Sequence, residues 1–339
     1  MSENLFLNLI EDEKKTNQNL YSSGPYWKHK NRRTIYQIKK NKINNFRGIN
    51  SGIGTSFSDN IVYDIRNEFN FKGRLASSLL LLPFLKSIFK SQLKITKSYI
   101  DRFLINQSFV FSNSKRVEQL INKYNFLQTT EFGCVQKFNF NKIEYSTHYL
   151  EMANRVDSFS EFINFKNIVN YFEIGGGFGA NIHFLLQNFR NIKKIVYLDT
   201  VPNIYIGTEY LRKFFRENVI DYLQTKKMDQ IKFSNDNSLE IICIPPWEIE
   251  RVECEIDHFH NAASFVEMPA HVVENYIKFV DKFNTTSISL LSYSKFDPQT
   301  TMDPNNLINF FKKELKSFKY PFVIPGLKPN NHYFVSKIK

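Results

Sequence analysis

A group of glycines between two acidic residues is the part of the sequence best suited to chemistry. Residues 173–180 read EIGGGFGA, and Asp199 follows 20 residues after Gly179. Glycine lets the backbone turn sharply and lets a ligand approach the main chain closely. A carboxylate at the end of the next strand can accept hydrogen bonds from both hydroxyl groups of a ribose. The segment therefore predicts a nucleoside-binding turn between a strand and a helix.

Two kinds of cofactor use such a turn. A dinucleotide site has the pattern G-x-G-x-x-G/A, which Gly175, Gly177 and Ala180 satisfy. An S-adenosylmethionine (SAM) site has an acidic residue two positions before G-x-G-x-G, and Glu173 completes that pattern with Gly179. SAM carries a sulfonium and an ammonium group, which a carboxylate attracts, whereas the same carboxylate would repel a pyrophosphate. We therefore predict SAM as the cofactor, bound by Glu173, Gly175, Gly176, Gly177, Gly179, Asp199 and Thr200, with His148 and Tyr149 from a segment that precedes the first strand.

Strands and helices alternate after about residue 165, which predicts a mostly parallel sheet with helices on both faces. In such sheets ligands bind at the carboxyl ends of the strands. Residues 1–165 are predicted to be a mainly helical region for substrate recognition, and residues 166–339 the cofactor-binding domain. The predicted strands are 169–174, 194–199, 239–244, 255–260 and 285–293, followed by an antiparallel pair at 322–325 and 332–338; the predicted helices are 180–189, 205–215, 269–283 and 306–315.

Three segments together resemble a known family. They are EIGGGFG at residues 173–179, DTVP at 199–202 and NAASFVEMP at 261–269. The chain resembles the sugar O-methyltransferases, bacterial proteins linked to surface-polysaccharide genes, over about residues 145–285. The SFVEM segment is the most specific part of the resemblance. The chain departs from the family pattern by one extra residue in DTVP, by Ala180 and by Val266.

The resemblance implies a Rossmann-like class I methyltransferase with a mostly parallel, seven-stranded sheet and an antiparallel C-terminal strand. It implies SAM-dependent O-methylation of a sugar hydroxyl, in a nucleotide sugar or a surface-polysaccharide unit. Residues 255–261 would end the fourth strand facing the methyl group.

A sugar hydroxyl is a poor nucleophile, so a general base beside it would help. His260 and Glu267 are the two candidates for this base, and Asn261 and Ser264 are candidates to hydrogen-bond the sugar or the methionine part of SAM. Other interpretations stay open. Ser264 and Glu267 also match a helix capping box, and His258 and His260 also suit ordinary buried histidines. A Mg²⁺ site built on the two histidines lacks a defined third ligand, so no metal is predicted.

All of the net charge of +12 lies in residues 1–150, which hold 23 Lys and Arg against 11 Asp and Glu. This excess suggests an anionic partner, such as a nucleotide or a lipid-linked phosphate, although a solvated basic surface has the same composition. Tyr26 and Trp27 are predicted to stack on a sugar ring or a base.

Two other functions remain as alternatives. An RNA or other small-molecule methyltransferase fits the charge, but residues 1–165 contain no RRM or KH signature, so nucleic acid is not the expected partner. An NAD-dependent dehydrogenase fits the glycines. The oligomeric state is not predicted.

Three cysteines without a C-x-x-C pair indicate neither a disulfide framework nor a structural zinc site. The polar N-terminus lacks the apolar stretch of a signal peptide, and the longest apolar run, residues 75–85, is too short to span a bilayer. A cytoplasmic location is therefore expected, with basic residues beside this run that allow peripheral membrane contact.

Overall fold

The computed structural model describes residues 2–21, 23–41, 43, 46, 112–125, 132, 138–140, 143–145, 147–293, 322–325 and 331–337. The chain divides into two compact units, residues 1–35 with 152–339 and residues 36–151. This division assigns the N-terminal helices to the same unit as the sheet, whereas the predicted domains are 1–165 and 166–339.

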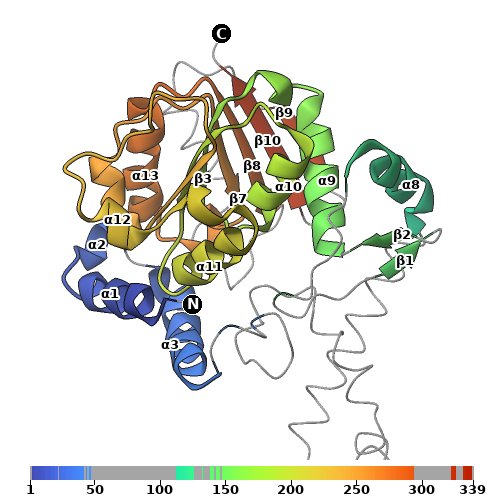
Figure 1. Cartoon of the computed structure of the whole chain (residues 1–339). Coiled ribbons are helices and arrows are strands. Elements are labelled where there is room, and N and C mark those ends of the chain that lie inside the picture. Colours follow the sequence, from blue (N-terminus) through green and yellow to red (C-terminus); the bar gives the residue numbers. More distant parts are fainter. Residues whose placement is uncertain are drawn as a thin grey trace, which may run out of the picture. The chain divides into compact units, whose positions relative to one another are not determined.

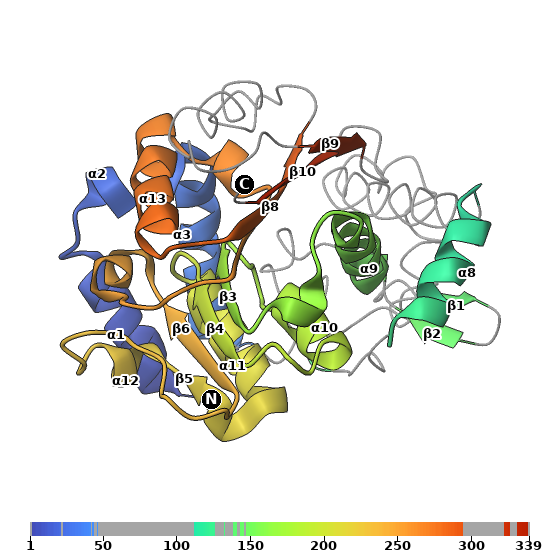
Figure 2. The ribbon, with the colours of Figure 1, turned by 90° about the horizontal axis from the view of Figure 1, so that it is seen from above.

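The first unit is built on an eight-stranded sheet of order β5-β6-β4-β3-β7-β8-β10-β9. Figure 1 labels β3, β7, β8, β10 and β9 of this sheet, and Figure 2 labels β5, β6 and β4. Every neighbouring pair is parallel except the two pairs made by β10, which runs antiparallel to β8 and β9. The predicted mostly parallel sheet with an antiparallel last strand is confirmed, and the two-residue edge strand β5 adds to it. The strands are β3 (Asn170–Ile174), β4 (Lys194–Leu198), β5 (Val219–Ile220), β6 (Glu240–Ile244), β7 (His258–Ala262), β8 (Ser287–Tyr293), β9 (Phe322–Pro325) and β10 (Asn331–Lys337).

Helices cover the two faces of this sheet. The predicted helices at 180–189, 205–215 and 269–283 are α10 (Ala180–Asn188), α11 (Asn203–Phe215) and α13 (Ala270–Lys282). Figure 2 shows α13 and α10 on opposite sides of the sheet. One side of α13 is apolar and buried, and it consists of Val272, Val273, Tyr276, Ile277 and Val280. The alternation of side chains along β3 and β7 places Phe172 and Phe259 in this core.

Strand β7 begins three residues later than predicted because Asp257 has another task. Its carboxylate accepts hydrogen bonds from the backbone N–H groups of Val169 and Asn170, both at 2.8 Å. Asp257 therefore satisfies the backbone at the start of β3 instead of extending β7.

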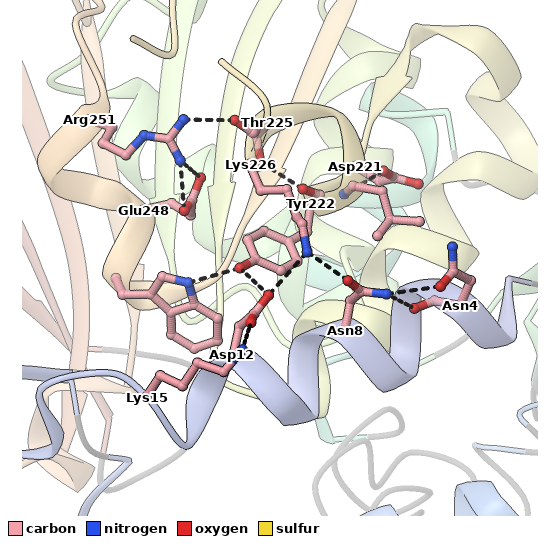
Figure 3. Close-up of polar contacts among 12 residues, drawn as sticks. Asn4, Asn8, Asp12, Lys15, Asp221, Tyr222, Thr225, Lys226, Glu248 and Arg251 are labelled. Atoms are coloured by element: carbon pink, nitrogen blue, oxygen red, sulfur yellow. Dashed lines mark hydrogen bonds and ion pairs between the residues drawn. The ribbon is translucent and has the colours of Figure 1, made fainter. Parts of the chain in front are cut away.

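The N-terminal helices attach to segments that follow the carboxyl ends of β5 and β6. Helix α1 (Glu3–Glu13) lies against α12 (Tyr222–Thr225) (Figure 3). Asp12 accepts hydrogen bonds from the Tyr222 hydroxyl at 3.0 Å and from Lys226 at 3.2 Å. Helix α2 (Gln18–Tyr21) follows, and the Tyr21 hydroxyl donates to Glu250 in the 3₁₀ helix η5 (Pro246–Arg251). These contacts hold the start of the chain at the edge of the sheet where ligands bind in α/β folds.

The second unit contains α8 (Ser114–Lys123) and a short hairpin of β1 (Phe138–Phe140) and β2 (Ile143–Tyr145). Val117 and Leu120, which lie one turn apart on the same side of α8, are buried. The apolar run 75–85 and the predicted helix 306–315 lie outside the described residues. Among the helices that the structure describes, none is both long and apolar enough to cross a membrane.

Candidate cofactor and active site

Three alternate glycines turn the chain between β3 and α10. Gly175, Gly177 and Gly179 have φ angles of 74°, 63° and 84°, which lie in the left-handed region that glycine adopts without strain. The N–H group of Gly175 donates to the carbonyl of Leu198 at 2.8 Å, so the turn is joined to the end of β4. The three glycines of the predicted G-x-G-x-G pattern are therefore the three positions at which the backbone of this turn has a positive φ angle.

Neighbouring side chains press closely on this turn. A Cβ atom on Gly175 would lie 2.2 Å from the Ser264 hydroxyl oxygen, and one on Gly176 would lie 2.8 Å from the Tyr197 ring. The Tyr197 hydroxyl also donates to the Gly177 carbonyl at 2.5 Å. Close packing or a positive φ angle therefore requires glycine at all four positions, Gly175, Gly176, Gly177 and Gly179.

Asp199 lies at the end of β4 and faces the turn. Its carboxylate accepts hydrogen bonds from the backbone N–H groups of Gly177 and Thr200, both at 2.7 Å. Burial raises the pKa of Asp199 to about 7, and these backbone hydrogen bonds offset only part of that effect. The structure therefore joins Asp199 to the glycine turn, and whether Asp199 and Thr200 bind the cofactor stays a prediction.

Glu173 is the second buried carboxyl group at the turn. Asn181 donates a hydrogen bond to it at 3.2 Å, and the Asn181 oxygen accepts one from Arg155 at 3.2 Å. Burial raises the pKa of Glu173 to about 7, and the Asn181 hydrogen bond and the Arg155 charge lower it only in part. The amide of Asn181 therefore links a buried cation to a buried carboxyl group, and it also donates to the Tyr171 hydroxyl at 2.9 Å.

Sequence reasoning missed Arg155 and Asn181. Arg155 lies in α9 (Thr147–Ser160), 18 positions before Glu173, and nothing in its local sequence marks it. Asn181 occupies the second position of α10, and an amide so close to the glycine turn was the available signal.

His258 and His260 are buried on the same face of the sheet as Glu173. The two ring nitrogens of His258 contact the hydroxyl groups of Ser287 at 2.8 Å and Ser289 at 2.7 Å. Burial lowers the pKa of His258 to about 3 and that of His260 well below its ordinary value. Both rings are therefore neutral at physiological pH.

The tautomer of His260 follows from its partners. Its Nδ1 lies 3.1 Å from the carbonyl oxygen of Ser289, which can only accept, so Nδ1 carries the proton. Its Nε2 is buried and has no hydrogen-bond partner within the described part of the chain. His260 is 2% exposed, which places this basic nitrogen inside the protein.

Asn261 and Ser264 join the end of β7 to the glycine turn. The Asn261 amide donates to the Ile174 carbonyl at 2.9 Å and to the Ser264 hydroxyl at 2.5 Å, and its oxygen accepts from the N–H group of Phe265. These bonds position the segment that follows, and whether the two residues also contact a substrate stays a prediction.

Glu267 ends the 3₁₀ helix η6 (Phe265–Glu267), three residues after Ser264. The Ser264 side chain makes no capping hydrogen bond, so the capping-box interpretation is wrong. The Glu267 carboxylate instead accepts a hydrogen bond from the indole nitrogen of Trp27 at 2.8 Å. The structure therefore joins a predicted catalytic residue to a predicted substrate-binding residue.

A close backbone approach sets the position of this Trp27. Helix α3 (Gly24–Asn41) begins at Gly24, whose φ is 70°. A Cβ atom at Gly24 would lie 3.1 Å from Pro269 and 3.3 Å from the Glu267 carbonyl oxygen. The start of α3 therefore packs directly on the segment that carries Glu267.

No contact with the glycine turn is described for the remaining predicted residues, Tyr149, His148 and Tyr26. Tyr149 is buried in α9, in the part of that helix that belongs to the second unit. The side chains of His148 and Tyr26 lie outside the described residues. Within the described ranges, no group of three or more His, Cys, Asp or Glu side chains is placed to hold a metal ion.

Comparison with protein-family models and with curated proteins finds no match. Among solved structures, the chain is similar to the mitomycin 7-O-methyltransferase MmcR, at 10% identity and a TM-score of 0.41, over 57% of this chain and 55% of that one. It is also similar to human N-acetylserotonin methyltransferase in complex with SAM, at 10% identity and a TM-score of 0.37, over 56% of this chain and 53% of that one. A third similar structure is the magnesium protoporphyrin IX methyltransferase of Synechocystis PCC 6803 with bound S-adenosylhomocysteine. The identity is 9% and the TM-score 0.40, over 70% of this chain and 100% of that one.

The chain spans little more than half the length of MmcR. The mostly parallel sheet and the reversed strand β10 match the predicted sheet. The similarity to the three structures concerns the fold alone.

Proposed function

We propose that the chain is a SAM-dependent O-methyltransferase that acts on a sugar hydroxyl, in a nucleotide sugar or a surface-polysaccharide unit. One observation carries the proposal. Two buried carboxyl groups, Glu173 and Asp199, flank a glycine turn at the carboxyl ends of β3 and β4.

The two carboxyl groups suit a cationic ligand. Burying a carboxylate is costly unless a positive charge lies nearby, and the cation behind Glu173 bonds to it only through Asn181. When bound, SAM supplies a methyl group on a positively charged sulfur. A dinucleotide would instead bring two phosphate charges to the same carboxylates, and this disfavours the dehydrogenase alternative.

Each residue of the turn has a part in binding. The glycines let the backbone approach a nucleoside, and Asp199 accepts hydrogen bonds from ribose hydroxyls with its remaining lone pairs. Glu173 attracts the positive end of the ligand. Asn261 and Ser264 hold the turn against the segment that carries Glu267.

Glu267 is the general base that we favour. It is half-buried rather than enclosed, and the Trp27 indole orients its carboxylate. It would accept the proton of the sugar hydroxyl as that oxygen attacks the methyl carbon in line with the departing sulfur. The Nε2 atom of His260 is buried, so a sugar hydroxyl has less access to it than to Glu267. His260 lies beside Glu173 on the neighbouring strand and suits a role in packing against that residue. Alignment of the two reactants supplies most of the acceleration in such a displacement.

The choice of a sugar rests on the resemblance of residues 261–269 to the sugar O-methyltransferases. The basic N-terminal region supports an acceptor that carries phosphate or another anion.

Calorimetry with SAM, S-adenosylhomocysteine (SAH) and NAD tests the cofactor. We expect SAM and SAH to bind and NAD not to bind. The variant Glu173→Gln should weaken SAM binding, whereas Glu248→Gln should not, because Glu248 is also buried but pairs with Arg251 within η5. Binding of NAD without SAM contradicts the proposal.

Mass spectrometry of host glycans, with and without the gene, tests the acceptor. We expect one sugar to lose the mass of one methyl substitution when the gene is deleted, and to regain it on complementation. If the glycans are unchanged and the protein binds SAM, the proposal of a sugar acceptor is wrong, whereas the proposal of a SAM-dependent methyltransferase still stands.

A further inference from the structure

Helix α3 carries an unusual excess of positive charge. Its 18 residues include Lys28, Lys30, Arg32, Arg33, Lys39 and Lys40, and they include no Asp or Glu. Such a helix has no acidic residue of its own with which to form i, i+4 ion pairs.

The charges lie on one side of the helix. At 3.6 residues per turn, the exposed residues Lys28, Arg32, Arg33, Tyr36, Lys39 and Lys40 fall within an arc of about 140°. Asn31, Thr34 and Ile38 fall on the opposite side, and all three are buried. The exposed arc is called the cationic face of α3 below.

Nothing that the structure describes neutralises this face. Its five Lys and Arg side chains make no ion pair with any described residue, whereas Lys30 lies outside the arc, 5.0 Å from the centre of the Trp27 ring. The cations span about 18 Å along the helix at 1.5 Å per residue. They form part of the region, residues 1–150, that holds the entire net charge.

We propose that the cationic face of α3 adsorbs to an anionic lipid surface. Long Lys and Arg side chains on one side of a rigid rod can all reach a flat surface at once. Tyr36, which is 62% exposed in the middle of the face, is a residue type enriched at membrane–water interfaces. The less polar side of the helix is already buried in the protein, so the helix binds by charge and does not insert.

A flat lipid surface fits the face better than RNA does. Proteins that hold single-stranded RNA interleave aromatic side chains with cations, so that successive bases stack. Tyr36 is the one aromatic residue among the exposed residues that the structure describes on this face, and none of those residues has a side-chain amide suited to contact base edges.

The position of α3 gives adsorption a consequence. The same helix begins at Gly24 and places Trp27 on Glu267, so a bound membrane would lie beside the segment that carries the proposed base. This consequence rests on the proposed function, whereas adsorption itself does not.

Vesicle co-sedimentation of the full chain tests the proposal. We expect binding to phosphatidylcholine vesicles that contain about 30% phosphatidylglycerol, weak binding to phosphatidylcholine alone, and loss of binding at high salt. The variant R32E/R33E/K39E/K40E should bind the anionic vesicles at least about tenfold more weakly.

A matched variant separates placement from net charge. R190E/K213E/K227E/K278E makes the same change in charge at four exposed sites scattered over the sheet-containing unit. We expect this variant to keep most of the vesicle binding, while circular dichroism and SAM calorimetry confirm that both variants fold. Equal losses in the two variants overturn the proposal. Vesicle binding that is absent while a single-stranded RNA oligonucleotide binds through α3 overturns it as well.

Discussion

The affinity for SAM should rise steeply with pH near neutrality. Glu173 and Asp199 are both buried and both have a pKa raised to about 7, and the charge of Asp199 contributes to the shift at Glu173. A sulfonium ion binds preferentially when these groups are ionised. Cofactor binding therefore releases protons, and it strengthens as pH rises through about 7.

The size of the effect follows from the fraction ionised. A group with a pKa of about 7 is roughly one tenth ionised at pH 6 and roughly nine tenths ionised at pH 8. If binding needs one carboxylate, the Kd for SAM falls about tenfold over this range, and it falls up to about 100-fold if binding needs both.

Calorimetry between pH 6 and 8 measures this change, with SAH as the internal control. SAH shares the amino acid and nucleoside parts of SAM but lacks the positive sulfur, so its Kd should change less. Glu173→Gln should remove part of the slope for SAM. Parallel pH profiles for the two ligands would refute the reasoning.

The same residue should limit the stability of the ligand-free protein. The folded pKa of Glu173 is raised from 4.5 to about 7, so its contribution to stability is present at acidic pH and is lost as pH rises through 7. A shift of that size corresponds to at most about 3 kcal/mol. Glu173→Gln should therefore raise the free energy of unfolding at pH 8 and change it little near pH 4.5. A lower free energy of unfolding for Glu173→Gln at pH 8 would contradict the raised pKa of Glu173 in the ligand-free protein.

Three further predictions concern the site. Glu267→Gln should lower kcat by roughly 10²–10⁴, and His260→Ala should lower it less; full complementation of glycan methylation by Glu267→Gln would exclude Glu267 as the base. Trp27→Phe should lower kcat and move the acidic limb of the pH–rate profile to higher pH, because a donor to the Glu267 carboxylate is lost. The matched variant Trp247→Phe should leave that limb in place, because its indole donates to the Tyr222 hydroxyl at 3.3 Å. Gly175→Ala should weaken SAM binding at least about tenfold, since the new Cβ meets the Ser264 hydroxyl at 2.2 Å and φ is 74°; unchanged binding would show that the turn is not the cofactor site.

Much of the fold was predictable because its signals are local. The alternation of apolar runs with amphipathic helices predicted the parallel sheet, and the spacing of Gly175, Gly177 and Gly179 matches the three left-handed φ angles. The place of Asp199 at the end of β4 was also predictable, since this acidic residue directly follows the apolar run of the strand in the chain.

Other features depend on contacts that leave no pattern in the neighbouring residues. The start of β7 was predicted too early because Asp257 caps the backbone of β3, 87 and 88 positions away. The two-residue strand β5 at the edge was too short to show a period.

Sequence by itself determined the glycine turn, its acidic flanks and the order of strands and helices, because short-range spacing encodes backbone conformation. Only the tertiary structure decided that Asn181 and Arg155 stand behind Glu173, and that Trp27 bonds to Glu267 across 240 positions. Hydrogen bonds between distant segments form when packing brings the segments together, so the local periodicity of the sequence does not predict these bonds.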